Sequence, residues 1–239
     1  MNNSITLVIC AYNEEKYIGH CLTYALTNFK DQFCEVIVVD NASTDATKEI
    51  ARSFKEVRVV HEQAKGLTKA RERGLQEAHG DIILYLDADT ELSPMWIETM
   101  KREFTNDTRV VCFSSPGFYT DVSLWVRIGT WIYWHIFAKV TAWFSGYMVM
   151  GSNFAAKRES LLSIGGFDTT ITFYGEDVDI GRRLHAVGRV VFSTDVHVRM
   201  SPRRLKGDGF WKTIYTYVAN YFSIAFVGKP TTKEYKDYR

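Results

Sequence analysis

The sequence predicts an α/β fold in which helices flank a central, mostly parallel sheet. Short continuous apolar runs such as Ile5–Cys10 are typical of strands that are covered on both faces. These runs alternate with segments in which apolar residues recur every three or four positions, the period of an amphipathic helix. Strands separated by such helices indicate βαβ units. The 239 residues, 46% of them hydrophobic, exclude wholesale disorder.

The first half of the chain supplies the expected strands in order, with helices between them. Helical periodicity runs from Ile18 to Leu26, then around Ile50–Phe54, and then from Gly66 to His79. Ser93 and Pro94 are typical of an N-cap and a first-turn proline, so we expect a fourth helix to begin there. The four expected strands are Ile5–Cys10, Glu35–Asp40, Val57–Val60 and Asp81–Asp87.

The second half is less regular and contains an aromatic segment. Four of the six tryptophans fall within residues 118–147, where we expect a helical insertion. Residues 147–157 are typical of a strand or loop, Glu176–Val187 of a helix, and Asp195–Val198 of a strand. Phe210–Val227 predicts an amphipathic C-terminal helix, followed by a charged tail. Because there is no internal repeat or flexible linker, a single domain is favoured.

Charge and cysteine content limit the partners and the compartment. The 29 Lys and Arg against 28 Asp and Glu give a net charge of +1, which argues against a nucleic-acid partner. The four cysteines form no CxxC pair, and Cys10 and Cys34 lie in or beside apolar runs, so we expect buried, reduced thiols. The N-terminus lacks the features of a signal peptide, so a cytoplasmic location is expected.

Two common nucleotide-binding motifs are excluded. The turn after the first strand, Cys10–Glu15, contains no glycine, whereas a dinucleotide fold needs glycines there to admit the pyrophosphate. Gly146 and Gly151 have the spacing of a P-loop, but Ser152 and Asn153 follow where Lys and Ser or Thr are required.

Acidic side chains follow the predicted strands at the edge where ligands bind in such sheets. Asp87 and Asp89 end the fourth strand, and the alternation of side chains along a strand places both on one side. Two such carboxylates can share one hard divalent cation, which would neutralise a diphosphate. The alternative is an ordinary acidic turn.

A second acidic cluster, Gly175–Asp179, begins a helix. Carboxylates in a first helical turn are stabilised by the helix dipole, which is one explanation. The other is a general base that removes a proton from a hydroxyl nucleophile. His197 follows in a strand-like stretch and is either structural or a ligand.

Seven motifs in order resemble the family-2 glycosyltransferases of the GT-A fold, over about residues 4–205. The resemblance implies a Rossmann-like GT-A domain, 1–205, with a nucleotide-sugar-binding half (1–115) and an acceptor-binding, catalytic half (116–205). Residues 206–239 would add the C-terminal helix and tail. The motifs are Val8–Glu15, Val38–Asp45, Lys65–Gly74 with its Ala70-Arg71 pair, Leu86–Asp89, Gly151–Asn153, Gly165–Asp168 and Gly175–Asp179.

The resemblance also implies roles for individual residues. Asp89 would coordinate Mn²⁺ or Mg²⁺, with Asp87 beside it and His197 completing the metal site; the mixed donor set favours Mn²⁺. Asp177 would be the catalytic base, with Glu176 as the second candidate. Residues expected to bind the nucleotide sugar are Ala11, Tyr12, Asn13, Glu14, Asp40, Asn41, Lys65, Arg71, Asp87, Ala88, Arg203 and Arg204.

The implied reaction is an inverting transfer of a sugar from a nucleotide-diphosphate sugar, with UDP favoured, to an acceptor hydroxyl. The acceptor would be a saccharide or a polyprenyl-phosphate-linked glycan precursor. A nucleotidyltransferase is the enzymatic alternative, although it would usually have a glycine-rich basic loop after the first strand. A non-catalytic sugar-binding or scaffold protein is the other alternative.

Two departures from the family pattern and one basic segment lead to separate predictions. Ala11 stands where many relatives have proline, and Glu72 where they commonly have asparagine, so the nucleotide contact near Glu72 is expected to differ. Ser201–Arg204 resembles a basic stretch of some bacterial relatives, and its arginines either grip the departing diphosphate or form a solvated turn.

The aromatic segments predict peripheral contact with the inner face of the cell membrane. Arg127, His135 and Lys139 interrupt residues 122–148, so we expect no membrane span there. Dense Trp and Tyr favour a membrane interface. The alternatives are core packing, sugar stacking, or a homo-oligomer interface. The cations expected to meet anionic headgroups are Arg199, Arg203, Arg204, Lys206 and Lys212.

Overall fold

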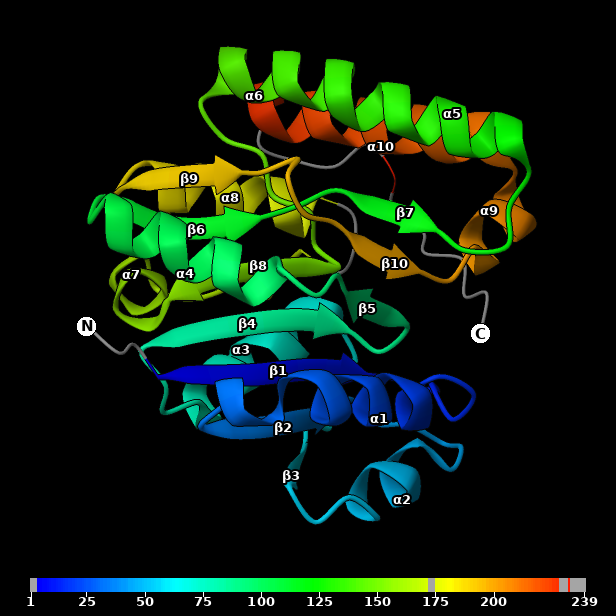
Figure 1. Ribbon diagram of the computed structural model, residues 1–239, viewed down its shortest axis with the longest axis vertical. Coiled ribbons are helices and arrows are strands. Elements are labelled where there is room, and N and C mark those ends of the chain that lie inside the picture. The colour runs from blue at the N-terminus through cyan, green and yellow to red at the C-terminus, as the bar shows by residue number, and fades with distance from the viewer. Residues whose placement is uncertain (1–3, 172–174, 228–231, 233–239) are drawn as a thin grey trace.

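A seven-stranded sheet in the order β3-β2-β1-β4-β8-β6-β9 forms the centre of the computed structural model, which describes residues 4–171, 175–227 and 232 (Figure 1). The paired strands run parallel except β8, which is antiparallel to β4 and β6. The predicted mostly parallel α/β sheet is confirmed. Its strands are β1 (Ile5–Ala11), β2 (Glu35–Asp40), β3 (Val57–His61), β4 (Ile82–Asp87), β6 (Val110–Ser114), β8 (Asn153–Lys157) and β9 (Arg189–Phe192).

Helices cover both faces of this sheet, which explains the continuous apolar character of its strands. Leu7 and Ile9 of β1 pack toward one helical layer, and the intervening Val8 packs toward the other. The first layer holds α1 (Ile18–Phe29), the short η1 (Lys30–Gln32), α2 (Thr47–Arg52) and α4 (Trp96–Asn106), and the second holds α3 (Leu67–Glu77), α7 (Arg158–Ser163) and α8 (Glu176–His185).

Several local predictions are wrong. The strand expected over Asp195–Val198 instead spans Val198–Met200. The fourth helix begins at Trp96 rather than at Ser93, whose hydroxyl instead accepts the backbone N–H of His197 at 3.3 Å. Val187 lies beyond the end of α8 and is exposed. Cys34 is exposed because it lies in the bend before β2, whereas Cys10 is half-buried; the cysteines are free thiols.

A second, three-stranded sheet extends the carboxyl-end side of the molecule. Its central strand β10 (Val198–Met200) is antiparallel to β5 (Thr90–Leu92) and parallel to β7 (Gly117–Tyr119). Figure 1 shows β10 leading to α9 (Arg203–Asp208) on the side to which the arrowheads of β1 and β4 point. This small sheet therefore returns the C-terminal part of the chain to the edge where the acidic loops lie.

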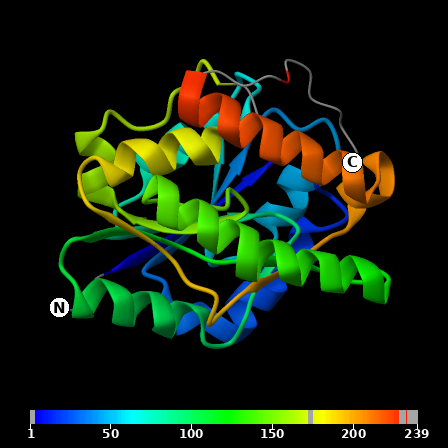
Figure 2. The same ribbon diagram turned by 90° about the horizontal axis from the view of Figure 1, so that it is seen from above.

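The aromatic segment forms one long helical insertion, as predicted. It consists of α5 (Leu124–Ile132), a π-helical turn η2 (Tyr133–Ala138) and α6 (Lys139–Ser145). The C-terminal helix α10 spans Phe210–Val227 and runs beside this insertion (Figure 2). Within the described ranges, none of the helices combines the length and the apolar character that crossing a membrane requires.

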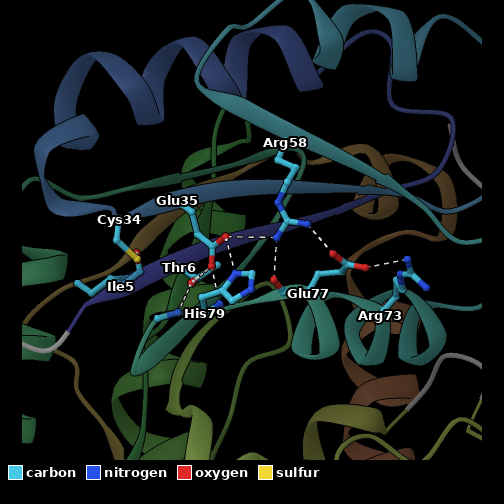
Figure 3. A network of polar contacts seen from close by, with 9 residues as sticks. Ile5, Thr6, Cys34, Glu35, Arg58, Arg73, Glu77 and His79 are labelled. Atoms are coloured by element: carbon cyan, nitrogen blue, oxygen red, sulfur yellow. Dashed lines mark hydrogen bonds and ion pairs between the residues drawn. The ribbon is translucent and has the colours of Figure 1, made fainter.

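A polar network fixes the β1–β2 pair near its amino end. Glu35, at the start of β2, accepts hydrogen bonds from the Thr6 hydroxyl at 2.7 Å and the His79 backbone N–H at 2.6 Å (Figure 3). Arg58 donates to Glu35 at 3.2 Å and to the backbone carbonyl of Glu77 at 2.7 Å. Although partial burial opposes it, these bonds lower the pKa of Glu35. We assign this cluster a structural role.

Candidate active site

The loops that follow β1 and β2 are tied to each other at the carboxyl edge of the sheet. Ala11, which ends β1 and is buried, pairs in register with Asp40 at the end of β2. Asn13 adopts a left-handed conformation, with φ 53°, and its side-chain oxygen accepts the backbone N–H of Thr44 at 2.8 Å. The Asn13 backbone N–H in turn donates to the Ser43 hydroxyl. Asn13 therefore joins the two loops into one wall.

Asp40 and Asn41 lie inside this wall rather than on its surface. Asp40 is 1% exposed, and its carboxylate contacts His61 Nδ1 at 2.9 Å. The amide of Asn41 donates to the carbonyls of Glu62 and Ala64, and its oxygen accepts the Gly66 N–H. Asn41 thus shapes the loop that leads into α3, which makes it a positioning residue.

Tyr12 and Lys65 form the exposed part of the same wall. The Lys65 ammonium donates to the Tyr12 hydroxyl at 2.8 Å and lies 4.7 Å from the centre of its ring. An aromatic ring and a cation at the mouth of the site suit a nucleobase and its phosphates.

Asp87 and Asp89 follow β4 as the sequence predicts, separated by the buried Ala88. The Asp87 side chain is 37% exposed, whereas that of Asp89 is 8% exposed. Burial, together with the nearby Asp87 and Glu14, raises the pKa of Asp89 to about 6 against the attraction of Arg203. Three carboxylates thus concentrate negative charge at the end of β4.

Arg203, at the start of α9, supplies the positive charge at this cluster. Its guanidinium makes two hydrogen bonds to Glu14, at 2.6 and 2.8 Å, and lies 3.1 Å from Asp89. It also lies 5.0 Å from the Tyr17 ring. The prediction that Arg203 meets headgroups is therefore wrong, because the guanidinium is held between carboxylates. The side chains of Arg204 and Lys206 lie outside the described residues.

The donor set at this edge fits a divalent cation. Carboxylate oxygens are the ligands that Mg²⁺ prefers, and Mn²⁺ accepts them as well. In the part of the chain that the structure describes, no group of three or more His, Cys, Asp or Glu side chains could hold a metal ion. Asp87 and Asp89 would therefore share the cation with water and diphosphate oxygens, as is usual for Mg²⁺.

His197 does not lie beside Asp87 and Asp89. It lies immediately before β10, where its backbone bonds to Ser93, whereas Asp89 lies just beyond the other end of this pairing. Its exposed ring makes an edge contact with Phe118 at 5.4 Å between ring centres. The register thus separates His197 from Asp89 by several strand positions, and the expected third metal ligand is absent from this arrangement.

Arg71 connects the two acidic clusters that the sequence singles out. Its buried guanidinium lies 3.2 Å from Glu176 at the start of α8 and 3.6 Å from Asp87 at the end of β4. It also donates to the Gly151 carbonyl at 2.6 Å. Arg71 therefore positions carboxylates from two elements instead of standing open to phosphates.

Glu176 and Asp177 differ in their surroundings. Glu176 is 9% exposed and engaged by Arg71, whereas Asp177 is half-buried. Burial raises the pKa of Asp177, although Arg71 and the backbone N–H groups of Val178 and Gly151 oppose this shift. Burial also raises the pKa of Glu176, to about 8, but Arg71 holds that carboxylate, so Asp177 is the better candidate to accept a proton.

Two tyrosines whose pKa values are raised in part by Asp177 were not identified as site residues from the sequence. Burial raises the pKa of Tyr133 in η2, and the Asp177 carboxylate adds to that shift. Burial also raises the pKa of Tyr221 in α10 to about 12, with a smaller contribution from Asp177. The Tyr221 hydroxyl donates to Ser145 at 2.9 Å. Only the aromatic density of both segments hinted at these residues.

Glu72, which departs from the family pattern, points away from the expected nucleotide site. Its carboxylate accepts the backbone N–H of Phe167 at 2.9 Å, in the turn after α7. A Cβ atom at Gly166 would lie 2.2 Å from a Glu72 oxygen, whereas one at Gly165 would meet nothing within 4 Å. Glu72 therefore makes a structural hydrogen bond to the turn after α7.

We expect Gly166→Ala to destabilise the fold more than Gly165→Ala. Both glycines have positive φ, 72° and 78°, so alanine is strained by about 1–2 kcal/mol at either position. Only Gly166→Ala also displaces Glu72, which adds a further cost of about 1–3 kcal/mol. Urea unfolding of both variants measures the difference; equal free energies of unfolding would contradict the role of Glu72.

Similar solved structures define the class of fold. Mannosyltransferase PcManGT from Pyrobaculum calidifontis, in complex with GDP-Man and Mn²⁺, has a TM-score of 0.71 and 22% identity, covering 95% of this chain and 64% of that one. S. aureus TarS 1–349 in complex with UDP-GlcNAc has a TM-score of 0.64 and 17% identity, covering 82% and 58%. The chain therefore has the GT-A fold, which confirms the predicted fold class.

Sequence comparison identifies the family. The family model described as glycosyl transferase family 2 matches residues 6–165, so the chain belongs to that family. Glycosyltransferase AglE of Haloferax volcanii is 33% identical over 100 residues, which is 39% of this chain and 33% of that protein. Glucosyl-dolichyl phosphate glucuronosyltransferase of the same organism is 25% identical over 181 residues, 69% and 56%. The chain thus spans a third to just over half the length of these relatives.

Proposed function

We propose that this protein is an inverting glycosyltransferase that moves a sugar from a nucleotide-diphosphate sugar to an acceptor hydroxyl. The observation that carries this proposal is the joint placement of two acidic clusters, Asp87 with Asp89 and Glu176 with Asp177, linked through Arg71. One cluster suits a cation beside a diphosphate, and the other suits a base beside a hydroxyl. Membership of family 2 supports the same reaction.

Individual residues would have distinct roles in this reaction. Tyr12, Asn13 and Asp40 would form the nucleoside wall, and Lys65 would meet the phosphates. A Mn²⁺ or Mg²⁺ ion at Asp89 and Asp87 would act as a Lewis acid on the leaving diphosphate. Asp177 would take the proton of the acceptor hydroxyl, while Arg71 holds Glu176 and Asp87 in place.

Arg203 would bind the negatively charged diphosphate of the donor. In the structure it is bonded to Glu14 and close to Asp89. On donor binding, the guanidinium would exchange part of its contact with these carboxylates for a bidentate contact with two phosphate oxygens. The proposed role of Arg203 in binding the donor therefore follows from its place in the carboxylate cluster.

For the donor we favour a UDP-sugar, and for the acceptor a glycan precursor linked to a polyprenyl phosphate. The relative from Haloferax volcanii named as a glucosyl-dolichyl phosphate glucuronosyltransferase supports an acceptor of this kind. Such an acceptor would place the protein at the inner face of the cell membrane, in peripheral contact with it.

Thermal-shift screening of nucleotide sugars, each with and without Mn²⁺, tests this function. A donor at about 100 times its dissociation constant stabilises the native state by about 2.7 kcal/mol, which gives a clear shift of the melting temperature. We expect the shift to depend on Mn²⁺ and to be largest for one UDP-sugar. If nucleoside triphosphates alone give the shift, the nucleotidyltransferase alternative gains support and the proposal fails.

A further inference from the structure

The outward side of the insertion helix exposes large apolar side chains along its whole length. Trp125, Trp143 and Phe144 are 81%, 78% and 76% exposed. Exposed residues recur every three or four positions from 124 to 144, so they form one continuous stripe. Monomeric proteins rarely expose contiguous apolar patches of this kind without a partner. We call this stripe the α5–α6 face; its most exposed members are Leu124, Trp125, Ile136, Phe137, Trp143 and Phe144.

The opposite side of the same helix anchors it to the rest of the protein. Thr130 and Ala138 are 4% and 1% exposed, and the Trp134 indole N–H donates to the Gly117 carbonyl at 2.8 Å. The aromatic residues therefore separate into an inward set that packs and an outward set that does not. The outward stripe is a surface of a fixed helix and not displaced core.

The charges on this stripe have a single sign. Arg127 and Lys139 lie exposed along it, and the sequence contains no Asp or Glu between residues 122 and 158. The neighbouring helix α10, with its exposed Lys212, also contains no acidic residue. A second copy docked face to face would bring like charges together, whereas an anionic lipid surface attracts them. Tryptophan is also enriched where proteins meet the lipid interface.

The α5–α6 face lies on an element that is linked through α10 to the helix carrying the proposed base. α10 packs against α8, whose first turn holds Asp177, and the Tyr221 hydroxyl of α10 donates to Ser145 at the end of α6 at 2.9 Å. Figure 2 shows both helices side by side on one side of the molecule. A membrane on the outward side of this helix would therefore place lipid headgroups near the acceptor side of the site.

From these contacts and charges we infer that the α5–α6 face docks on an anionic lipid bilayer, with the aromatic side chains in the headgroup region and Arg127 and Lys139 near lipid phosphates. The inference rests on the proposed function only for the purpose of this binding, which is to deliver a lipid-linked acceptor to Asp177. The binding itself requires neither donor nor acceptor, so it can be tested separately.

Flotation of the full chain with phosphatidylcholine vesicles, with and without phosphatidylglycerol, is the test. We expect the protein to float with the anionic vesicles in the absence of nucleotide and metal. The pair Trp125→Glu and Trp143→Glu should abolish this binding. The pair Arg127→Gln and Lys139→Gln should weaken it about fivefold per charge on anionic vesicles only.

A matched control variant introduces two glutamates at exposed apolar positions outside the α5–α6 face. Leu162 and Val187 are both 49% exposed and lie outside this face, so the pair Leu162→Glu and Val187→Glu should float like the unaltered chain. Circular dichroism melting of each variant reports the fold. The inference is overturned if the chain fails to float, binds neutral vesicles equally well, or forms a dimer that Trp125→Glu breaks. Vesicle binding without sugar transfer would instead count against the proposed function alone.

Discussion

Replacing Asp177 with asparagine is expected to lower kcat by about 10²–10⁴-fold while the dissociation constant of the donor stays nearly unchanged. The amide cannot accept the proton of the acceptor hydroxyl, but it keeps the size of the side chain and its place at the start of α8. Arg71 would still hold Glu176 and Asp87. Steady-state kinetics, together with donor binding by calorimetry, measures both quantities.

The pH profile provides a second readout of the same group. Because burial raises the pKa of Asp177 above its ordinary value of 3.8, the base is protonated over a wider acidic range. The rate constant kcat/KM should therefore rise with pH along a limb that lies above the range in which an ordinary aspartate titrates. In Asp177→Asn this limb should disappear from the residual activity.

Neighbouring acids on the same helix are the controls. Asp179 is bonded to Arg182 and Arg183 at 3.1 and 2.8 Å, so Asp179→Asn should affect stability rather than the chemical step. Glu176→Gln should weaken the contact with Arg71 and retain measurable transfer. If Glu176→Gln is inactive while Asp177→Asn is active, the assignment of the base is wrong.

The sequence predicts the parts of this protein whose signals are local. β1, β2 and β4 are apolar runs, and the acidic or amide residues that follow each run belong to the loop at its carboxyl end. Because the carboxyl ends of parallel strands lie at one edge of a sheet, these loops come together there. The positions of Asp40, Asp87 and Asp89 at this edge follow from that rule. The acidic start of α8 follows a helix and not a parallel strand, so the family resemblance, rather than this rule, indicated its role.

Contacts between distant short segments could not be predicted in the same way. The sheet formed by β5, β10 and β7 pairs three-residue strands far apart in the chain, and such strands carry almost no periodicity. Its register places Arg203 at Glu14 and Asp89 and takes His197 away from them. A basic residue after a strand gives no indication of which acid it will meet, so Arg203 was expected at headgroups or phosphates.

Replacing Asp89 with asparagine is expected to lower turnover by about 10³-fold and to remove the dependence of the remaining activity on Mn²⁺. A metal ion contributes several kcal/mol to the stabilisation of a leaving diphosphate, and each 1.36 kcal/mol corresponds to tenfold in rate. Thermal shifts measured with UDP, in the presence and absence of Mn²⁺, should show that the metal no longer adds to the stabilisation.

The fold should survive this change, which separates loss of the metal from loss of structure. The pKa of Asp89 is raised to about 6, mainly by burial, so the ionised side chain costs the folded state free energy at neutral pH. Asparagine removes that charge and keeps the size of the side chain beside Arg203. We therefore expect a melting temperature equal to or slightly above that of the unaltered chain.

Glu91, two residues further along, is the matched control. Its carboxylate contacts His20 at 2.7 Å and Arg199 at 3.2 Å. Glu91→Gln should leave both turnover and the Mn²⁺ shift unchanged. Undiminished activity in Asp89→Asn would remove this residue from the metal site. Arg203 would then be a permanent structural counter-ion of Glu14 and Asp89, because no incoming cation would compete for their negative charge.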